Sequence, residues 1–308
     1  MKLIELIIIP FGLFLLKILP RKKILDLSCV DFPRKISLAK IVQFVILHQD
    51  LLHLIEPKKK KEINPDNIDS DFVDLYKKNN LENEYRKTGI YHTDGLLIWS
   101  LIEKYKPKIM VETGTGRGIS SQIIVKGLNF FSEGSKLVTI GTGEPNVIKE
   151  AKNNLSRFKN IKLIVGFAPK DLIPTLESID KKQEIGFFID GPKGSSKDFI
   201  PLLDYIYSKF NPCFLAIHDC ESHIAKNYDK NGKYSNGHIN QSRVNLVNFY
   251  EKNLTQNFSL YFMSNAWCRK YDFLNSEIYE KHKDIQPFFY KGSKQVSHSP
   301  NIALILKK

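Results

Sequence analysis

Short apolar runs alternate with longer amphipathic stretches through the C-terminal three quarters of the chain. Strands separated by helical segments are typical of a parallel sheet with crossover helices. We therefore expect an α/β fold, a Rossmann-like doubly wound sheet of seven strands with helices on both faces. The predicted strands are 108–112, 136–140, 161–166, 184–190, 213–219, 259–265 and 301–307. Before the first of them, Asp94 is expected to cap a helix that runs through 95–105 and ends near Pro107.

The N-terminal part has a different pattern. Residues 6–16 are apolar without a charge, and residues 36–55 are a long apolar stretch that predicts a packing helix. Residues 56–71 contain two prolines and alternating blocks of charge, which is typical of a linker. The sequence therefore predicts an N-terminal apolar and helical extension with a linker over 1–70, followed by a larger domain over 71–308.

The first apolar segment raises the question of a membrane. A spanning helix needs about 20 apolar residues, and this segment is shorter and contains Pro10 and Gly12. The features of a cleavable signal peptide are not clear. Three alternatives remain for residues 1–23: a short anchor, an interfacial helix, or a helix buried on the domain. Basic residues at 21–23 favour the cytoplasmic side for the domain after them, so we expect a cytoplasmic protein, with attachment to the cytoplasmic face of a membrane as the alternative.

Composition adds a basic charge to this picture. Against 33 Asp and Glu stand 46 Lys and Arg, which gives a formal net charge of +13. The clusters at 21–23 and 58–61 suit an anionic surface such as lipid headgroups, or form a solvated lysine-rich surface. The sequence carries no zinc finger, recognition helix or aromatic–basic RNA motif, so nucleic acid is not an expected partner. Its four cysteines are widely spaced without a C-x-x-C pair, which argues against a zinc site or a disulfide framework.

A glycine-rich loop, TGTGRG at 113–118, joins the first predicted strand of the larger domain to a helix. Glycines in such a loop let the backbone approach a ligand and expose N–H groups at the start of the helix. The dinucleotide fingerprint fails, because Ile119 stands where its third glycine belongs and Gly141, not an acid, ends the second strand. NAD is thereby disfavoured, and the lack of a lysine-containing phosphate loop disfavours ATP hydrolysis.

Ionisable residues end the fourth and fifth predicted strands. Asp190 follows the fourth strand, and His218 with Asp219 ends the fifth. Because the carboxyl ends of parallel strands meet at one crevice, we expect the three side chains to lie close together. Lys193 completes an Asp-x-x-Lys pattern and is either part of that site or a solvated turn lysine.

Taken together, the acid and glycines of VETGTGRG, FIDGPKG and FLAIHD resemble the class I S-adenosylmethionine-dependent methyltransferases. Over residues 90–308 the chain is most similar to the metal-dependent small-molecule O-methyltransferases. The resemblance implies S-adenosylmethionine as the cofactor. The residues that would hold it are Glu112, Gly114, Gly116 and Gly118, with Asp190 facing it and Glu144 as the candidate for the ribose, because Gly141 replaces the family's acid.

The resemblance also implies a reaction. Asp190, His218 and Asp219 would bind Mg²⁺ or another divalent metal, although an imidazole suits transition metals better than magnesium. Lys193 or His223, or alternatively His238, would deprotonate the acceptor. The acceptor would be a small hydroxylated molecule such as a sugar, polyketide or phenol, or a glycolipid. Gly141, and Phe167 where the family often has a polar residue, indicate the alternative of a methyltransferase-fold binding protein with lost or altered catalysis.

Overall fold

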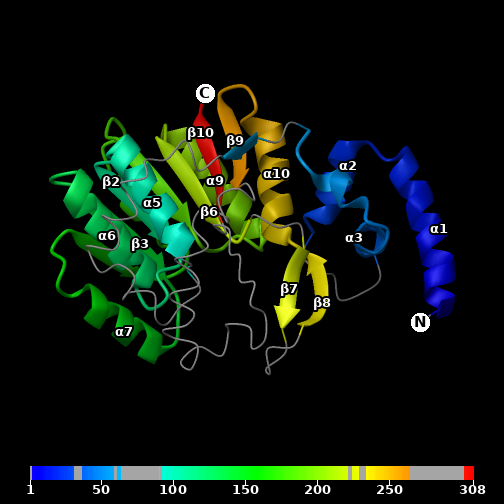
Figure 1. The fold of residues 1–308 in the computed structure, drawn as a ribbon, viewed down its shortest axis with the longest axis horizontal. Coiled ribbons are helices and arrows are strands. Elements are labelled where there is room, and N and C mark those ends of the chain that lie inside the picture. The colour runs from blue at the N-terminus through cyan, green and yellow to red at the C-terminus, as the bar shows by residue number, and fades with distance from the viewer. Residues whose placement is uncertain are drawn as a thin grey trace.

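The computed structural model describes residues 2–30, 37–58, 61–63, 90, 92–220, 224–228, 234–263 and 302–308. Its centre is a twisted sheet flanked by helices, with the N-terminal helices packed at one end (Figure 1). Eight strands form the sheet in the order β1-β9-β10-β6-β5-β2-β3-β4. They are β1 (Lys61–Ile63), β2 (Ile109–Thr113), β3 (Lys136–Gly141), β4 (Ile161–Val165), β5 (Ile185–Ile189), β6 (Phe214–His218), β9 (Phe258–Met263) and β10 (Ile302–Lys307).

The doubly wound topology predicted from the sequence is confirmed. All seven predicted strands are present, as β2 to β6, β9 and β10. β10 runs antiparallel to both of its neighbours, β6 and β9, and the other pairings in this sheet are parallel. An eighth strand, β1, pairs with β9 at the edge, so part of the segment predicted as a linker belongs to the sheet.

Helices cover both faces of the sheet because alternate strand residues point to opposite sides. Met110 of β2 and Phe188 of β5 are buried in one cluster with α5 and α6. Their neighbours Val111 and Phe187 are buried in the other cluster with α9 and α10. The helices of this domain are α5 (His92–Tyr105), α6 (Ile119–Phe131), α7 (Pro145–Leu155), α8 (Ile173–Glu177), α9 (Ser196–Lys209) and α10 (Gln241–Asn253).

The N-terminal extension is helical, as expected, and consists of α1 (Lys2–Ile18), α2 (Arg21–Ser28), α3 (Leu38–His48) and the short 3₁₀ helix η1 (Leu51–Ile55). The long helix predicted over 36–55 is divided by Asp50, whose φ of 52° is incompatible with a continuous α-helix. α2 is attached to α10 by ion pairs of Arg21 with Glu251 and of Lys252 with Asp26. Within the described residues, no helix has both the length and the apolar character to cross a membrane.

A two-stranded antiparallel hairpin, β7 (Ile224–Tyr228) and β8 (Tyr234–Ile239), lies between β6 and α10 in the chain. It extends from the sheet next to α10 and the N-terminal helices (Figure 1). The boundary predicted near residue 70 lies outside the described residues.

Candidate functional site

The strand order creates a switch point between β2 and β5. From β2 the chain moves outward through β3 to β4, and it returns on the other side of β2 to form β5 and β6. In open α/β sheets, ligands bind outside the carboxyl ends of the strands at such a point. The glycine loop 114–118 follows β2, and the loop that contains Asp190 and Lys193 follows β5, so both predicted motifs lie at the switch point.

The glycine loop has a backbone that only glycine adopts easily. Gly114, Gly116 and Gly118 have φ angles of 92°, 50° and 81°, in the left-handed region that is strained for other residues. A Cβ atom on Gly114 would lie 3.0 Å from the backbone carbon of Asp190, so the loop after β2 lies directly against the end of β5. Among the described residues, a Cβ on Gly116 would meet nothing nearer than 4.0 Å. In this part of the structure Gly116 therefore faces open space.

Glu112 lies buried beneath this loop. Its Oε2 atom accepts hydrogen bonds from the Ser121 hydroxyl of α6 and, at 2.6 Å, from the Thr139 hydroxyl of β3. The Thr115 hydroxyl in turn lies 2.6 Å from that of Thr139. Burial raises the pKa of Glu112 above its ordinary value. Its Oε1 atom has no partner among the described residues, so the side chain fastens β3 and α6 and leaves one buried acceptor for a ligand or water.

The structure gives a physical reason for the glycine at the end of β3. A Cβ atom on Gly141 would lie 2.9 Å from Cβ and 3.0 Å from the backbone nitrogen of Thr115. The glycine loop is held in this position because Thr115 donates its N–H to the carbonyl of Ile140. An acid at position 141 would thus collide with the loop. The ribose ligand predicted in its place, Glu144, is an exposed residue that precedes α7 and makes no side-chain capping bond.

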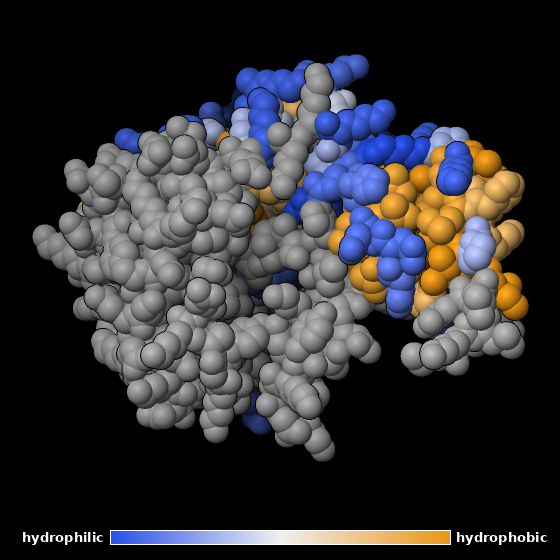
Figure 2. Space-filling model, turned by 45° about the vertical axis from the view of Figure 1, so that its right-hand side comes forward, coloured by the Kyte–Doolittle hydropathy of each residue, from blue (hydrophilic) through white to orange (hydrophobic). Residues whose placement is uncertain are grey.

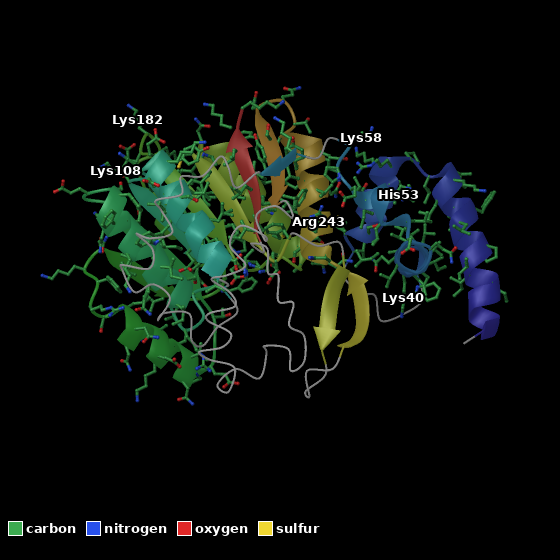
Figure 3. All side chains as sticks on the ribbon, in the orientation of Figure 1. Lys40, His53, Lys58, Lys108, Lys182 and Arg243 are labelled. Atoms are coloured by element: carbon green, nitrogen blue, oxygen red, sulfur yellow. The ribbon has the colours of Figure 1, made fainter. Side chains whose placement is uncertain are left out.

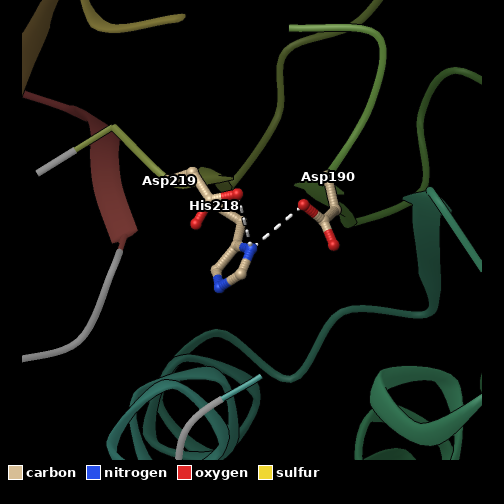
Figure 4. Close-up of side chains that lie close together, drawn as sticks. All are labelled: Asp190, His218 and Asp219. Carbon is tan, nitrogen blue, oxygen red and sulfur yellow. Dashed lines mark hydrogen bonds and ion pairs between the residues drawn. The ribbon is translucent and has the colours of Figure 1, made fainter. Parts of the chain in front are cut away.

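The ionisable residues that end β5 and β6 do come together. The Lys193 ammonium donates to a carboxylate oxygen of Asp190 and, at 2.8 Å, to Oδ2 of Asp219. Nδ1 of His218 is 3.0 Å from Oδ1 of Asp190 and 3.6 Å from Oδ2 of Asp219 (Figure 4). The three side chains that were expected to lie close together therefore do so, with ligand atoms within 4.8 Å of one another.

Asp94 is a fifth member that the sequence did not reveal. We expected Asp94 to cap α5, but the helix begins at His92, and the buried carboxylate of Asp94 lies 3.3 Å from Nε2 of His218. This expectation was wrong because the first turn of α5 packs against the end of β6, where Asp94 meets His218 instead of solvent. The only signal in the sequence was an acid directly before an apolar helical stretch.

The cluster is strongly charged. Burial opposes the charged form of His218, but the charge of Asp190 and the hydrogen bonds to Asp190 and Asp94 outweigh it and raise the pKa of His218 to about 10. Burial likewise opposes the charge of Asp190, and the cations His218 and Lys193 nevertheless hold its pKa below the ordinary value. For Lys193, the carboxylates of Asp190 and Asp219 outweigh burial and raise its pKa. These shifts favour the charged forms of these groups, an imidazolium at His218 and an ammonium at Lys193.

A divalent metal does not fit this arrangement as it stands. Asp190, His218 and Asp219 do offer three ligand atoms within 4.8 Å of one another. The Lys193 ammonium, however, lies between the two carboxylates that a metal would need. Both nitrogens of His218 face carboxylates, and an imidazolium has no lone pair for a metal. A metal would therefore have to displace one cation and deprotonate another.

Polar residues of α10 and the residue before it hold the ends of these strands in place. Asn240 donates its side-chain amide to the carbonyl of Asp219 at 2.9 Å, and Asn245 donates to the carbonyl of Lys193 at 3.2 Å. Asp219 itself has a φ of 56°, which is unusual for a residue other than glycine. Such strain persists where surrounding contacts fix it, and it is concentrated at functional sites.

The remaining predicted residues are not brought into the cluster by the described structure. Phe167, 42% exposed, follows β4 at the rim. His223 lies outside the described residues, and for His238 the structure describes only the backbone of β8.

The chain matches no protein-family model and no curated protein sequence. Solved structures similar to it include an O-methyltransferase from Bacillus cereus in complex with SAH, with 18% identity and a TM-score of 0.42 over 62% of this chain and 82% of that one. Another is an O-methyltransferase of tomaymycin synthesis from Streptomyces achromogenes in complex with SAM, with 16% identity and a TM-score of 0.44 over 64% and 90%. A SAM-dependent O-methyltransferase from Thermotoga maritima has 14% identity and a TM-score of 0.42 over 74% and 71%. These similarities are loose, and conclusions about function therefore depend on the site itself.

Proposed function

We propose that this protein is an S-adenosylmethionine-dependent methyltransferase that methylates a hydroxyl oxygen of a small acceptor such as a sugar, polyketide or phenol. The observation that carries the proposal is the contact between Gly114 and Asp190. It joins a glycine loop suited to a cofactor directly to a charged cluster suited to an acceptor hydroxyl, at the switch point of a doubly wound sheet.

The cofactor would be held by the glycine loop. The open space at Gly116 admits a ligand to the backbone, and the N–H groups at the start of α6 suit an anionic group such as the carboxylate of its methionine part. The unpartnered Oε1 of Glu112 offers a further acceptor. When bound, S-adenosylmethionine supplies an electrophilic methyl group. Glu144 remains the candidate for its ribose hydroxyls, because Gly141 has no room for a side chain.

The charged cluster would handle the acceptor's proton. A hydroxyl oxygen becomes a better nucleophile as it loses its proton, which needs an acceptor for the proton and a positive charge near the oxygen. The Asp219 side chain is 51% exposed at the rim and can accept the proton, whereas Lys193 is only 13% exposed and is held by two carboxylates. We therefore assign proton acceptance to Asp219 and charge stabilisation to Lys193, in place of the base role first expected for Lys193.

His218 and Asp94 would position this pair. His218 contacts Asp190 and Asp94 from inside the protein, where its side chain is 4% exposed. This fixes the carboxylate of Asp190, which then orients Lys193. In this proposal the positive charges of Lys193 and His218 stabilise the negative charge in the site, a role for which the sequence suggested a metal ion.

Transfer of a labelled methyl group from S-adenosylmethionine to a panel of sugars, phenols and polyketides tests the proposal. We expect transfer in the presence of a metal chelator, and a loss of about 100-fold or more in Asp219→Asn, in line with the worth of a positioned base. Glu144→Gln is the comparison that reports on ribose binding. If the chain binds the cofactor but methylates no acceptor of these classes, it is instead a binding protein, the alternative favoured by Gly141 and Phe167.

A further inference from the structure

The helix α1 exposes an apolar stripe. Ile7, Phe11, Phe14 and Ile18 are 66%, 50%, 58% and 59% exposed, and their spacing of four, three and four residues places them on one face of the helix. The N-terminal region holds six of the nine large apolar side chains that are exposed among the described residues, since Val30 and Leu38 belong to it as well. Figure 2 shows the hydrophobic surface gathered over this end of the molecule.

The opposite face of α1 is already occupied by the protein. Gly12 lies so close to α3 that a Cβ on it would come within 2.3 Å of a Val45 methyl group, and Leu16 is buried in the core. Ile8 and Leu13 pack against the same core. The helix is therefore fixed on the domain by one apolar face, while a second apolar face points away from it.

Basic residues border the exposed stripe. Lys17 lies on α1 directly before Ile18, and Lys22 and Lys23 are the second and third residues of α2, which follows α1 in the chain; all three are exposed. Arg21 is engaged by Glu251 and Asp26 by Lys252. Among the side chains that the structure describes here, these two acids are paired, which leaves the lysines with a net positive charge. Lysines beside an apolar face are placed to extend their charged ends to phosphate groups while the stems lie on the hydrocarbon boundary.

We infer that the exposed face of α1 docks on an anionic lipid bilayer and lies in its interface. An apolar helix face bordered by lysines is the arrangement that binds such a surface. With 17 residues α1 spans about 26 Å at 1.5 Å per residue. The face opposite the exposed stripe is committed to α3, so the helix lies along the membrane surface instead of crossing it. A second copy of this chain is a poorer occupant, because a symmetric contact through this stripe would bring the lysines of both copies together.

Sedimentation of the full chain with vesicles tests this inference, which stands independently of the proposed transferase activity. We expect binding to vesicles of phosphatidylcholine with phosphatidylglycerol, much weaker binding to phosphatidylcholine alone, and a decrease with added salt. The double substitution Phe11→Ser/Phe14→Ser should lower the partition coefficient by about 10-fold or more, because it removes two large apolar side chains from the contact. Lys22→Glu/Lys23→Glu should lower it by a similar factor on the anionic vesicles only.

Matched controls lie elsewhere on the molecule. Phe130 of α6 is 52% exposed, so Phe130→Ser removes a phenylalanine of comparable exposure. Lys182 lies at the other end of the molecule, far from Lys40 of α3 (Figure 3), and it forms an exposed adjacent pair with Lys181. The substitution Lys181→Glu/Lys182→Glu therefore makes the same charge change. Neither control should alter vesicle binding. Equal vesicle binding by the Phe11→Ser/Phe14→Ser chain would overturn the inference. It would also be overturned if the unsubstituted chain does not bind vesicles but forms a dimer that this substitution dissociates.

Discussion

The Lys193 ammonium lies 2.8 Å from the carboxylate of Asp219 and also donates to Asp190, so that it joins the ends of β5 and β6. This contact decides what the charged cluster can bind. The same two carboxylates, together with His218, would otherwise offer three ligand atoms for a divalent cation. In this protein a side-chain cation takes that position.

Removal of the ammonium should therefore create a metal site. Lys193→Met keeps the length of the side chain but frees both carboxylates, so we expect a gain of about 10-fold or more in Mn²⁺ affinity, measured by calorimetry on the purified chain. Lys197→Met, which changes an exposed lysine at the second position of α9, is the control and should change nothing. Tight Mn²⁺ binding by the unsubstituted chain, unaffected by Lys193→Met, would refute the proposal that Lys193 replaces a metal.

The histidine of the cluster gives a dependence of stability on pH. The pKa of His218 is raised from an ordinary 6.5 to about 10, so the folded state binds this proton more tightly than the unfolded state does. Its contribution is complete below pH 6.5, declines as the pH rises, and is lost above about 10. The loss of melting temperature caused by His218→Gln should therefore be larger at pH 6 than above pH 10.

His48→Gln, which changes an exposed histidine of α3, serves as the comparison and should show no such difference. A His218→Gln effect that is the same at both ends of this pH range would mean that His218 is neutral in the folded protein.

The buried network under the glycine loop should contribute to stability. Thr139→Val keeps the shape of the side chain but removes the donor to Glu112 and the partner of Thr115. Leaving these buried groups unsatisfied should lower the free energy of unfolding by about 1–3 kcal/mol, measured by urea denaturation. Thr255→Val, at an exposed position after α10, should cost less than about 0.5 kcal/mol. Equal effects of the two substitutions would show that the network adds nothing.

The close contact between the end of β3 and the glycine loop can be tested in the same way. Gly141→Ala should lower the melting temperature, because its methyl group meets Thr115 at 2.9 Å, and the cost of such overpacking is about 1–3 kcal/mol. Gly194→Ala places its methyl with no atom of the described residues within 4 Å and should be close to neutral. The double substitution Thr115→Gly/Gly141→Ala should cost less than the sum of its parts, because it removes the Thr115 Cβ that the added methyl meets. Strict additivity would rule out this contact.

The sheet could be predicted well from the sequence, because a parallel strand that is buried on both faces is a short continuous run of apolar residues. The strands β2, β5 and β6 are buried along their whole length and are such runs, whereas the edge strand β4 is only partly buried and contains Lys162. The residues that end β5 and β6 could be identified directly, which placed Asp190, His218 and Asp219 at one edge. The glycines of the loop could also be interpreted, because positive φ angles require them.

What the sequence did not reveal depends on contacts between distant segments. From the sequence Asp94 is predicted to be a helix cap, and only the packing of α5 against β6 brings it to His218. The reason for Gly141 lies in Thr115, which comes 26 positions earlier in the chain, and no local pattern connects the two. Lys193 likewise reads as a turn lysine or a base until both of its carboxylate partners are known.

The proposed function depends above all on binding of S-adenosylmethionine by the glycine loop, and calorimetric titration of the chain with this cofactor measures that binding. Gly116→Val should fill the open space and weaken binding by about 10-fold or more. Gly134→Val imposes comparable backbone strain at a φ of 71° and has no described atom within 4 Å of its Cβ, so it should leave binding unchanged. We expect saturable binding with one site per chain, sensitive to the first substitution and not to the second. No heat at millimolar cofactor, or equal loss in both variants, would show that the loop is not a site for this cofactor.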